Sequence, residues 1–309
     1  MTAASANGMT LSREAEIAKL RRLPRAALWV MAARPKTLSL SVSPVIAGTA
    51  IAAQRSNWRV DVFIFAILSA ISIQIGANLW NDAADAVRGV DSRERLGPPR
   101  VTALGLLDGR TVRRAAILAY FLAALSGLYL IAIGGTSILA IGVLSLLMGY
   151  LYSMGPWPLS ATPFGEILVI LFFGAAAVGG TVFLHTGGVD GTTLWLGASL
   201  GLPAAAVLLL NNHRDRRTDA IAGRRTLAIL IGVAGSRRLY AALLFGALAG
   251  LLCLAHIGNY AMAVLLVFAG LLTIQMSYMP VSAGLNRLLL RTALFQLAAV
   301  VALPVSALI

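Results

Sequence analysis

The chain has 309 residues, of which 59% are hydrophobic and only 12% are charged. Soluble globular proteins carry about 25% charged residues, so this composition excludes a soluble domain and indicates an integral membrane protein. A formal charge of +13 would usually suggest nucleic-acid binding, but the basic residues lie between apolar spans and we expect no nucleic-acid partner. The single cysteine, Cys253, excludes an intrachain disulfide, and the three scattered histidines offer no zinc-type spacing.

Residues 1–33 are polar and basic, and they contain no short apolar core followed by a small-residue cleavage site, so we expect no cleaved signal peptide. Residues 20–33 place basic side chains on one side of a helix and apolar ones on the other, which is typical of a helix at the bilayer surface. A loose tail is the alternative. We therefore expect a cytoplasmic or interfacial segment over 1–33 and a transmembrane domain over 34–309.

A helix that crosses a membrane needs about 20 mostly apolar residues. Runs of that length, bounded by charges and by Gly or Pro, predict an all-α integral membrane protein. The nine expected transmembrane helices cover residues 37–54, 60–80, 114–133, 136–153, 164–184, 193–211, 238–256, 260–279 and 289–308.

Lysine and arginine are distributed unevenly among the connections. With the N-terminus in the cytoplasm, 23 of the 25 basic residues fall on the cytoplasmic side, and only Arg55 and Arg59 fall outside. Because cytoplasmic loops are enriched in Lys and Arg, this pattern predicts a multi-pass protein of a bacterial-type inner membrane. Its N-terminus would be cytoplasmic and its C-terminus outside.

The first large cytoplasmic connection opens with the sequence NLWNDAAD, residues 78–85, called here the first motif. Asn78, Asp82 and Asp85 stand at i, i+4 and i+7, and Asn81 and Asp85 repeat the i, i+4 step, so a helix that continued through them would project them from one face. Asp91 follows in the same connection. Carboxylates beside a membrane helix are costly unless a cation or basic groups compensate them.

The second large connection opens with NNHRDRRTD, residues 211–219, called here the second motif. Asn211, Asp215 and Asp219 again follow helical spacing, and both connections are rich in arginine. Such carboxylates suit Mg²⁺, which is usually shared with substrate phosphates, and arginine suits phosphate oxygens. The pair predicts a diphosphate held by magnesium at the cytoplasmic surface. Ordinary Asp–Arg ion pairs would explain one such loop, but two matched loops disfavour that explanation.

At these residues the chain resembles the UbiA superfamily of membrane prenyltransferases, which carry Asn-Asp-x-x-Asp in a first loop and Asp-x-x-x-Asp in a second. Within it, the chain most resembles the 1,4-dihydroxy-2-naphthoate branch of menaquinone biosynthesis. The resemblance covers nearly the whole chain, and the matching pieces are ARPKTLSLSVSPVIAGTA, NLWNDAADAVRGVDSRERLGPPRVTALG, YSMGPWPLSATPFGEILVILFFGAAAVGGT and NNHRDRRTDAIAGRRTLAILIG.

The resemblance implies a nine-helix bundle around a central cavity that opens to the cytoplasm and laterally to lipid. It implies four catalytic aspartates that also bind Mg²⁺, namely Asp82, Asp85, Asp215 and Asp219. Asp91 is a fifth metal-ligand candidate; it departs from the common superfamily spacing, in which the third aspartate stands at the position of Gly89, and fits the naphthoate branch. The substrate-binding candidates are Lys36, Asn78, Asn81, Arg100, Tyr152, Asn211, Asn212 and Arg214.

The implied reaction is transfer of a polyprenyl group from polyprenyl diphosphate to 1,4-dihydroxy-2-naphthoate with loss of CO₂, giving a demethylmenaquinone. The 4-hydroxybenzoate branch resembles Tyr-x-x-x-Lys or Arg after the fourth span, whereas this chain has no basic residue between Tyr152 and Arg214. Two alternatives are a UbiA-type enzyme with another acceptor, such as 4-hydroxybenzoate, another aromatic ring, a tetrapyrrole or a glycerol phosphate, and a transporter of an anionic lipid or metabolite. The sequence indicates neither the prenyl chain length nor the oligomeric state.

Two residues remain open at this point. Glu166 stands at the start of the fifth span, where an intramembrane acid is a functional hypothesis and a helix-dipole partner is the alternative. His213 stands where the family pattern favours an apolar residue, and the sequence does not explain it.

Overall fold

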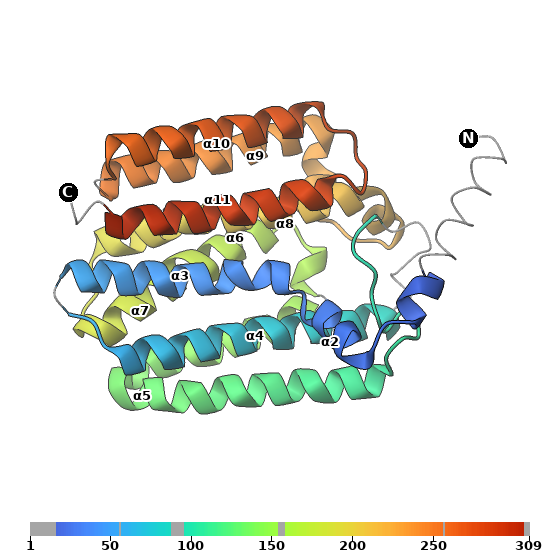
Figure 1. Cartoon of the computed structure of the whole chain (residues 1–309), viewed down its shortest axis with the longest axis horizontal. Coiled ribbons are helices and arrows are strands. Elements are labelled where there is room, and N and C mark those ends of the chain that lie inside the picture. The colour runs from blue at the N-terminus through green and yellow to red at the C-terminus, as the bar shows by residue number, and fades with distance from the viewer. Residues whose placement is uncertain (1–16, 56, 88–95, 154–157, 256, 306–309) are drawn as a thin grey trace.

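The computed structural model describes residues 17–55, 57–87, 96–153, 158–255 and 257–305. These ranges form a bundle of long helices that lie side by side (Figure 1). In chain order they are α2 (Arg25–Ala33), α3 (Pro35–Gln54), α4 (Val60–Val87), α5 (Gly109–Ser153), the 3₁₀ turn η1 (Leu159–Ala161), α6 (Gly165–Val169), the π-helix η2 (Ile170–Ala176), α7 (Ala177–Thr186), α8 (Gly191–Ile221), α9 (Leu227–Leu254), α10 (Asn259–Tyr278) and α11 (Leu285–Val305).

Eight helical stretches in the described ranges are long and apolar enough to cross a membrane, if α6, η2 and α7 are taken together as one stretch. One of the eight, α5, accounts for two predicted spans. Its 45 residues would reach about 68 Å as a straight helix, more than twice the thickness of a hydrocarbon core of about 30 Å. At Gly135 the φ of 61° and ψ of −147° are not helical. Tyr120 and Gly149, on opposite sides of that glycine, are in contact, since a Cβ added at Gly149 would lie 3.2 Å from the Tyr120 hydroxyl. The chain therefore turns back at Gly135, as the expected spans 114–133 and 136–153 require.

Two helices continue well past the ends of their predicted spans. The apolar pattern ends at residues 80 and 211, but α4 extends to Val87 and α8 to Ile221. Hydropathy marks where the apolar residues stop, whereas the alanine-rich and arginine-rich segments that follow still favour helix. Both motifs therefore lie on continuous helices, as their spacing predicted, at one end of the bundle, which we call the motif end.

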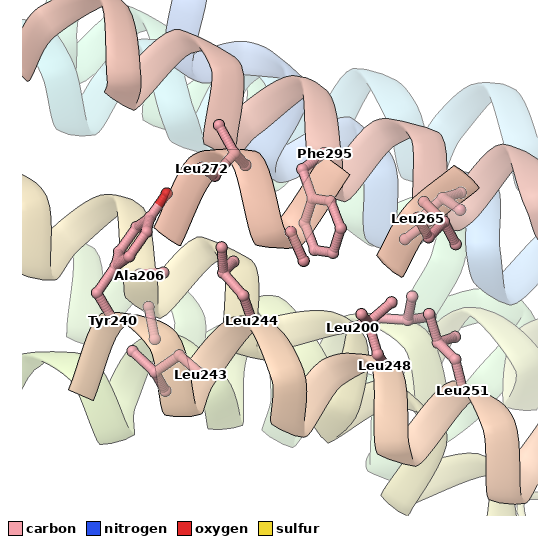
Figure 2. Packing of buried hydrophobic residues seen from close by; sticks show 14 of the residues in the cluster. Leu200, Ala206, Tyr240, Leu243, Leu244, Leu248, Leu251, Leu265, Leu272 and Phe295 are labelled. Carbon is pink, nitrogen blue, oxygen red and sulfur yellow. The ribbon is translucent and has the colours of Figure 1, made fainter. Parts of the chain in front are cut away.

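The largest hydrophobic core lies among α8, α9, α10 and α11, and Figure 2 shows part of its packing. Leu200 of α8, Leu244 of α9, Leu272 of α10 and Phe295 of α11 are each no more than 1% exposed. Helix α8 is the most enclosed span, with 72% of its apolar window buried. The helix that carries the second motif is therefore fixed by neighbours on most sides.

A second core fixes the end of α4 that carries the first motif. Leu28 and Ala32 of α2 pack with Leu79 and Ala83 of α4 and with Val112 of α5. The described part of the N-terminal segment is thus held against the first motif. Its predicted place at the membrane surface stays a prediction.

Candidate active site

Among the first-motif residues whose side chains the structure describes, Asp82 is the most deeply buried, at 1% exposure. Its Oδ1 accepts a hydrogen bond from the backbone N–H of Thr102 at 2.9 Å. Two residues before Thr102, the buried Arg100 donates from Nη1 to the carbonyl oxygen of Asn81 at 2.6 Å. The segment after the first motif therefore folds back onto α4. Of the two predicted site residues at this contact, Asp82 belongs to α4 and Arg100 to the returning segment.

Asn78, a predicted substrate-binding residue, is engaged by the protein itself. Its Nδ2 donates to the carbonyl oxygen of Ala33 at 2.8 Å and to Thr37 Oγ1 at 3.0 Å, and its Oδ1 accepts from Gln74 at 3.3 Å. The side chain ties α4 to the turn between α2 and α3, directly before the exposed Lys36. Asn78 thus positions the first turn of α3, and its direct contact with substrate stays a prediction.

The second motif pairs a buried arginine with its neighbouring carboxylate. Arg214 Nε donates to Asp215 Oδ1 at 2.9 Å and Nη2 donates to Oδ2 at 2.6 Å, the two-pronged geometry that guanidinium also uses with phosphate. The Arg214 side chain is only 2% exposed. One turn later, Asp219 forms an ion pair with Arg224 at 3.3 Å. The carboxylates of this motif are therefore already compensated by arginine.

Asn286, at the start of α11, connects the second motif to the segment that follows the first motif, and it was not predicted from the sequence. Its Oδ1 accepts from Arg214 Nη1 at 2.6 Å, and its Nδ2 donates to the carbonyl oxygen of Leu96 at 3.1 Å. Leu96 belongs to the segment that follows the first motif. The only signal in the sequence is one amide residue in the polar stretch before the last span.

A second contact that the sequence did not predict involves Asn212, also on α8. Asn212 Nδ2 donates to Glu166 Oε1 at 2.9 Å, and Glu166 is only 3% exposed. Asn211 is half-buried on α8, and Tyr152 is half-buried next to the last residue of α5. His213 is 1% exposed, and its Nδ1 has no partner in the described part of the chain.

Asp91 and the side chain of Asp85 lie outside the described residues, so their predicted roles stay predictions. Among the residues that are described, no three Asp, Glu, His or Cys side chains gather closely enough to hold a metal. Mg²⁺ is commonly bound by one or two carboxylates together with substrate phosphates and water. Asp82, Asp215 and Asp219 offer carboxylate oxygens, the ligand type that Mg²⁺ prefers, and their role as metal ligands stays a prediction.

The model of the UbiA prenyltransferase family matches residues 41–302, which include both motifs. The chain belongs to this family. The resemblance of the motifs to the UbiA pattern is thereby confirmed.

Curated UbiA relatives match over most of the chain. The 1,4-dihydroxy-2-naphthoate octaprenyltransferase of Mycobacterium tuberculosis is 38% identical over 228 residues, which cover 73% of this chain and 76% of that protein. The enzyme of the same name from Escherichia coli is 33% identical over 240 residues, covering 76% of this chain and 77% of that protein.

Solved structures of UbiA homologues share the fold. The homologue from Aeropyrum pernix superimposes with a TM-score of 0.65 at 17% identity, covering 85% of this chain and 96% of that one. The homologue from Archaeoglobus fulgidus, bound to DMAPP and Mg²⁺, gives 0.64 at 15% identity, covering 90% and 99%. The predicted all-α membrane bundle is thus confirmed.

Proposed function

We propose that this UbiA protein transfers a polyprenyl group from a polyprenyl diphosphate to 1,4-dihydroxy-2-naphthoate, with loss of CO₂. The observation that carries the proposal is the pairing of two aspartate motifs with buried arginines at one end of a membrane bundle. The curated relatives named 1,4-dihydroxy-2-naphthoate octaprenyltransferase support the choice of acceptor.

Magnesium, when bound, would neutralise charge that develops on the leaving diphosphate. Asp82, Asp215 and Asp219 are the described residues that would hold it. The guanidinium of Arg214 already donates two parallel hydrogen bonds to Asp215, and the same two N–H groups can donate to two phosphate oxygens. Lys36, exposed in the first turn of α3, adds a further positive charge for the diphosphate.

The reaction balances as an electrophilic substitution. The bond between the allylic carbon and the diphosphate oxygen breaks, and the electron pair leaves with the diphosphate. The allylic carbon then bonds to the ring carbon that bears the carboxylate, and CO₂ departs, leaving its bonding electrons in the ring. The product is the reduced form of a demethylmenaquinone. Apolar helices around the site would exclude water from the allylic cation.

The same proposal places the motif end at the cytoplasmic face of a bacterial inner membrane. Arg55 and Arg59, the two basic residues that the charge pattern leaves outside, flank the turn between α3 and α4. That turn lies at the opposite end of α4 from the first motif. The distribution of charge along the bundle therefore agrees with the positive-inside rule.

The test is to purify the protein in detergent and incubate it with a polyprenyl diphosphate, Mg²⁺ and dihydroxynaphthoate, with 4-hydroxybenzoate in a parallel reaction. We expect a prenylated naphthalene product that has lost CO₂ and that disappears when EDTA is added. Product from hydroxybenzoate alone would overturn the acceptor assignment. Because detergent leaves no sealed compartment, product formation would also exclude transport as the sole activity.

The matched variant is Asp82→Asn. An amide oxygen can still accept the N–H of Thr102, so the contact that holds the following segment survives while the charge is lost. We expect this variant to remain folded and to lose turnover. Asp82→Ala is a poorer test because it also leaves the Thr102 N–H without its acceptor, which costs about 1–3 kcal/mol.

A further inference from the structure

Glu166 carries a buried oxygen that the protein leaves unpaired. Its Oε1 accepts from Asn212, while its Oε2 is inaccessible to solvent and has no hydrogen-bond partner in the described part of the chain. The whole residue is 3% exposed. A carboxylate offers about four acceptor sites, and buried polar atoms are nearly always satisfied. This oxygen is therefore placed to accept a hydrogen bond from a group outside the chain.

The position of Glu166 relates it directly to the second motif. Asn212, Asp215 and Asp219 stand at i, i+3 and i+7 on α8 and share one face. Glu166 meets that face at Asn212, three residues, or about 4.5 Å along the helix axis, from Asp215 toward the middle of the bundle. A ligand held by the second motif would thus extend past this carboxylate.

The helix that carries Glu166 is shaped for this contact. Helix α6 continues into the π-helix η2, and Gly174 of η2 lies so close to α8 that an added Cβ would be 2.6 Å from the carbonyl oxygen of Gly197. In a regular α-helix, residues 166 and 174 would be offset by about 80°. The i→i+5 bonding of a π-helix widens the turn and reduces that offset. Glu166 and Gly174 can therefore both face α8.

The chemistry of the proposed substrates selects one group as the ligand of this oxygen. The diphosphate is anionic and would be repelled by a carboxylate, and the isoprenoid chain has no hydrogen-bond donor. A hard cation is disfavoured because the neighbouring group is the donating amide of Asn212. The hydroxyl groups of a dihydroxy aromatic acceptor are the remaining donors.

We propose that Glu166 binds a ring hydroxyl of the acceptor through Oε2, while Asn212 fixes the carboxylate through Oε1. The hydrogen bond orients the ring beside the second motif and increases electron density in the ring that attacks the allylic carbon. This inference rests on the proposed function, since it assumes an acceptor with a ring hydroxyl.

The test uses Glu166→Gln in the purified full-length protein. To keep the bond from Asn212, the new amide must present its oxygen there and its NH₂ group to the acceptor, so a donor replaces an acceptor. We expect kcat/KM for dihydroxynaphthoate to fall about 10- to 150-fold, the range for a hydrogen bond to a charged group. The KM for polyprenyl diphosphate and the melting temperature should stay close to those of the wild type. Glu166→Asp, which keeps the charge, should have a kcat/KM between those of the wild type and Glu166→Gln.

Gln296→Leu is the control for loss of a buried polar side chain against α8. Gln296 is fully buried and donates to the carbonyl oxygen of Leu200 at 3.3 Å, and its Oε1 has no partner among the residues that the structure describes. This variant should leave the KM values for both substrates unchanged. An equal rise in both KM values for Glu166→Gln, or a loss matched by Gln296→Leu, would show a structural role and overturn the inference.

Competing ligands with one hydroxyl separate this inference from the proposed function. The two ligands are 1-hydroxy-2-naphthoate and 4-hydroxy-2-naphthoate. The one that lacks the hydroxyl bound by Glu166 should inhibit the wild type and Glu166→Gln equally. The one that keeps this hydroxyl should inhibit the wild type more strongly than Glu166→Gln. If the substitution weakens both ligands equally, or neither, Glu166 does not bind a ring hydroxyl. If the wild type forms no naphthoate product at all, the proposed function fails first.

Discussion

Asn286 links the second motif to the segment that follows the first motif, so its replacement tests whether the two motifs work as one site. The change to leucine keeps the branched shape of the side chain and removes both hydrogen bonds, the one from Arg214 Nη1 at 2.6 Å and the one to the Leu96 carbonyl at 3.1 Å. The Arg214 side chain is 2% exposed, so water cannot easily take the place of the lost acceptor. The guanidinium would keep only its bonds to Asp215.

The magnitude follows from these two bonds. A hydrogen bond to a charged group contributes about 1.5–3 kcal/mol and one between neutral groups about 0.5–1.5 kcal/mol, so we expect the free energy of unfolding to fall by about 2–4.5 kcal/mol. The Arg214 contribution alone corresponds to about a 10- to 150-fold effect. If the motifs form one diphosphate site, kcat/KM for polyprenyl diphosphate should fall by about that factor.

The assay combines thermal unfolding in detergent with initial rates at varied polyprenyl diphosphate. Asn286→Asp keeps the acceptor for Arg214 and loses only the donor to Leu96, so it should retain more activity than Asn286→Leu. Asn259→Leu, at the exposed first residue of α10, controls for the loss of an amide at a helix start. If Asn286→Leu behaves like Asn259→Leu in both measurements, the link between the motifs has no functional role.

Three further predictions concern the metal, the helix packing and the effect of pH. Chelation with EDTA should stop turnover without lowering the melting temperature, because the second-motif aspartates already have arginine partners. A large drop in melting temperature on chelation would mean that metal holds the bundle together. Gly174→Ala should destabilise by about 1–3 kcal/mol because its Cβ would meet backbone, while Gly142→Ala in open space should not; equal melting temperatures would refute the close packing. Hydrogen bonds from Thr193 hold the pKa of Asp190 below its ordinary value, so its stabilisation is present above the unfolded pKa of about 3.9 and is lost as pH falls through the folded pKa. Melting temperatures measured from pH 5 down to pH 3 should therefore fall more steeply for wild type than for Asp190→Asn, and parallel curves would contradict this assignment.

The sequence by itself determined the features that depend on local pattern. Long apolar runs identified the membrane spans, including two within α5 on either side of Gly135, where only a residue without a Cβ adopts the turn easily. Helical spacing placed Asp82 with its motif on one helix, and Asp215 with Asp219 on another. These inferences succeed because hydropathy and the 3.6-residue period are properties of neighbouring residues.

Only the tertiary structure decided which groups from other helices meet those faces. Asn78 donates a hydrogen bond to the turn before α3, and Asn286 of the last helix accepts one from Arg214. Glu166 accepts a hydrogen bond from Asn212, which lies 46 positions away in the sequence. Such partners depend on how helices pack, and here also on a π-helical turn and on glycines that let backbones approach. Helical periodicity tells which side of a helix a residue faces, but it carries no information about what lies opposite.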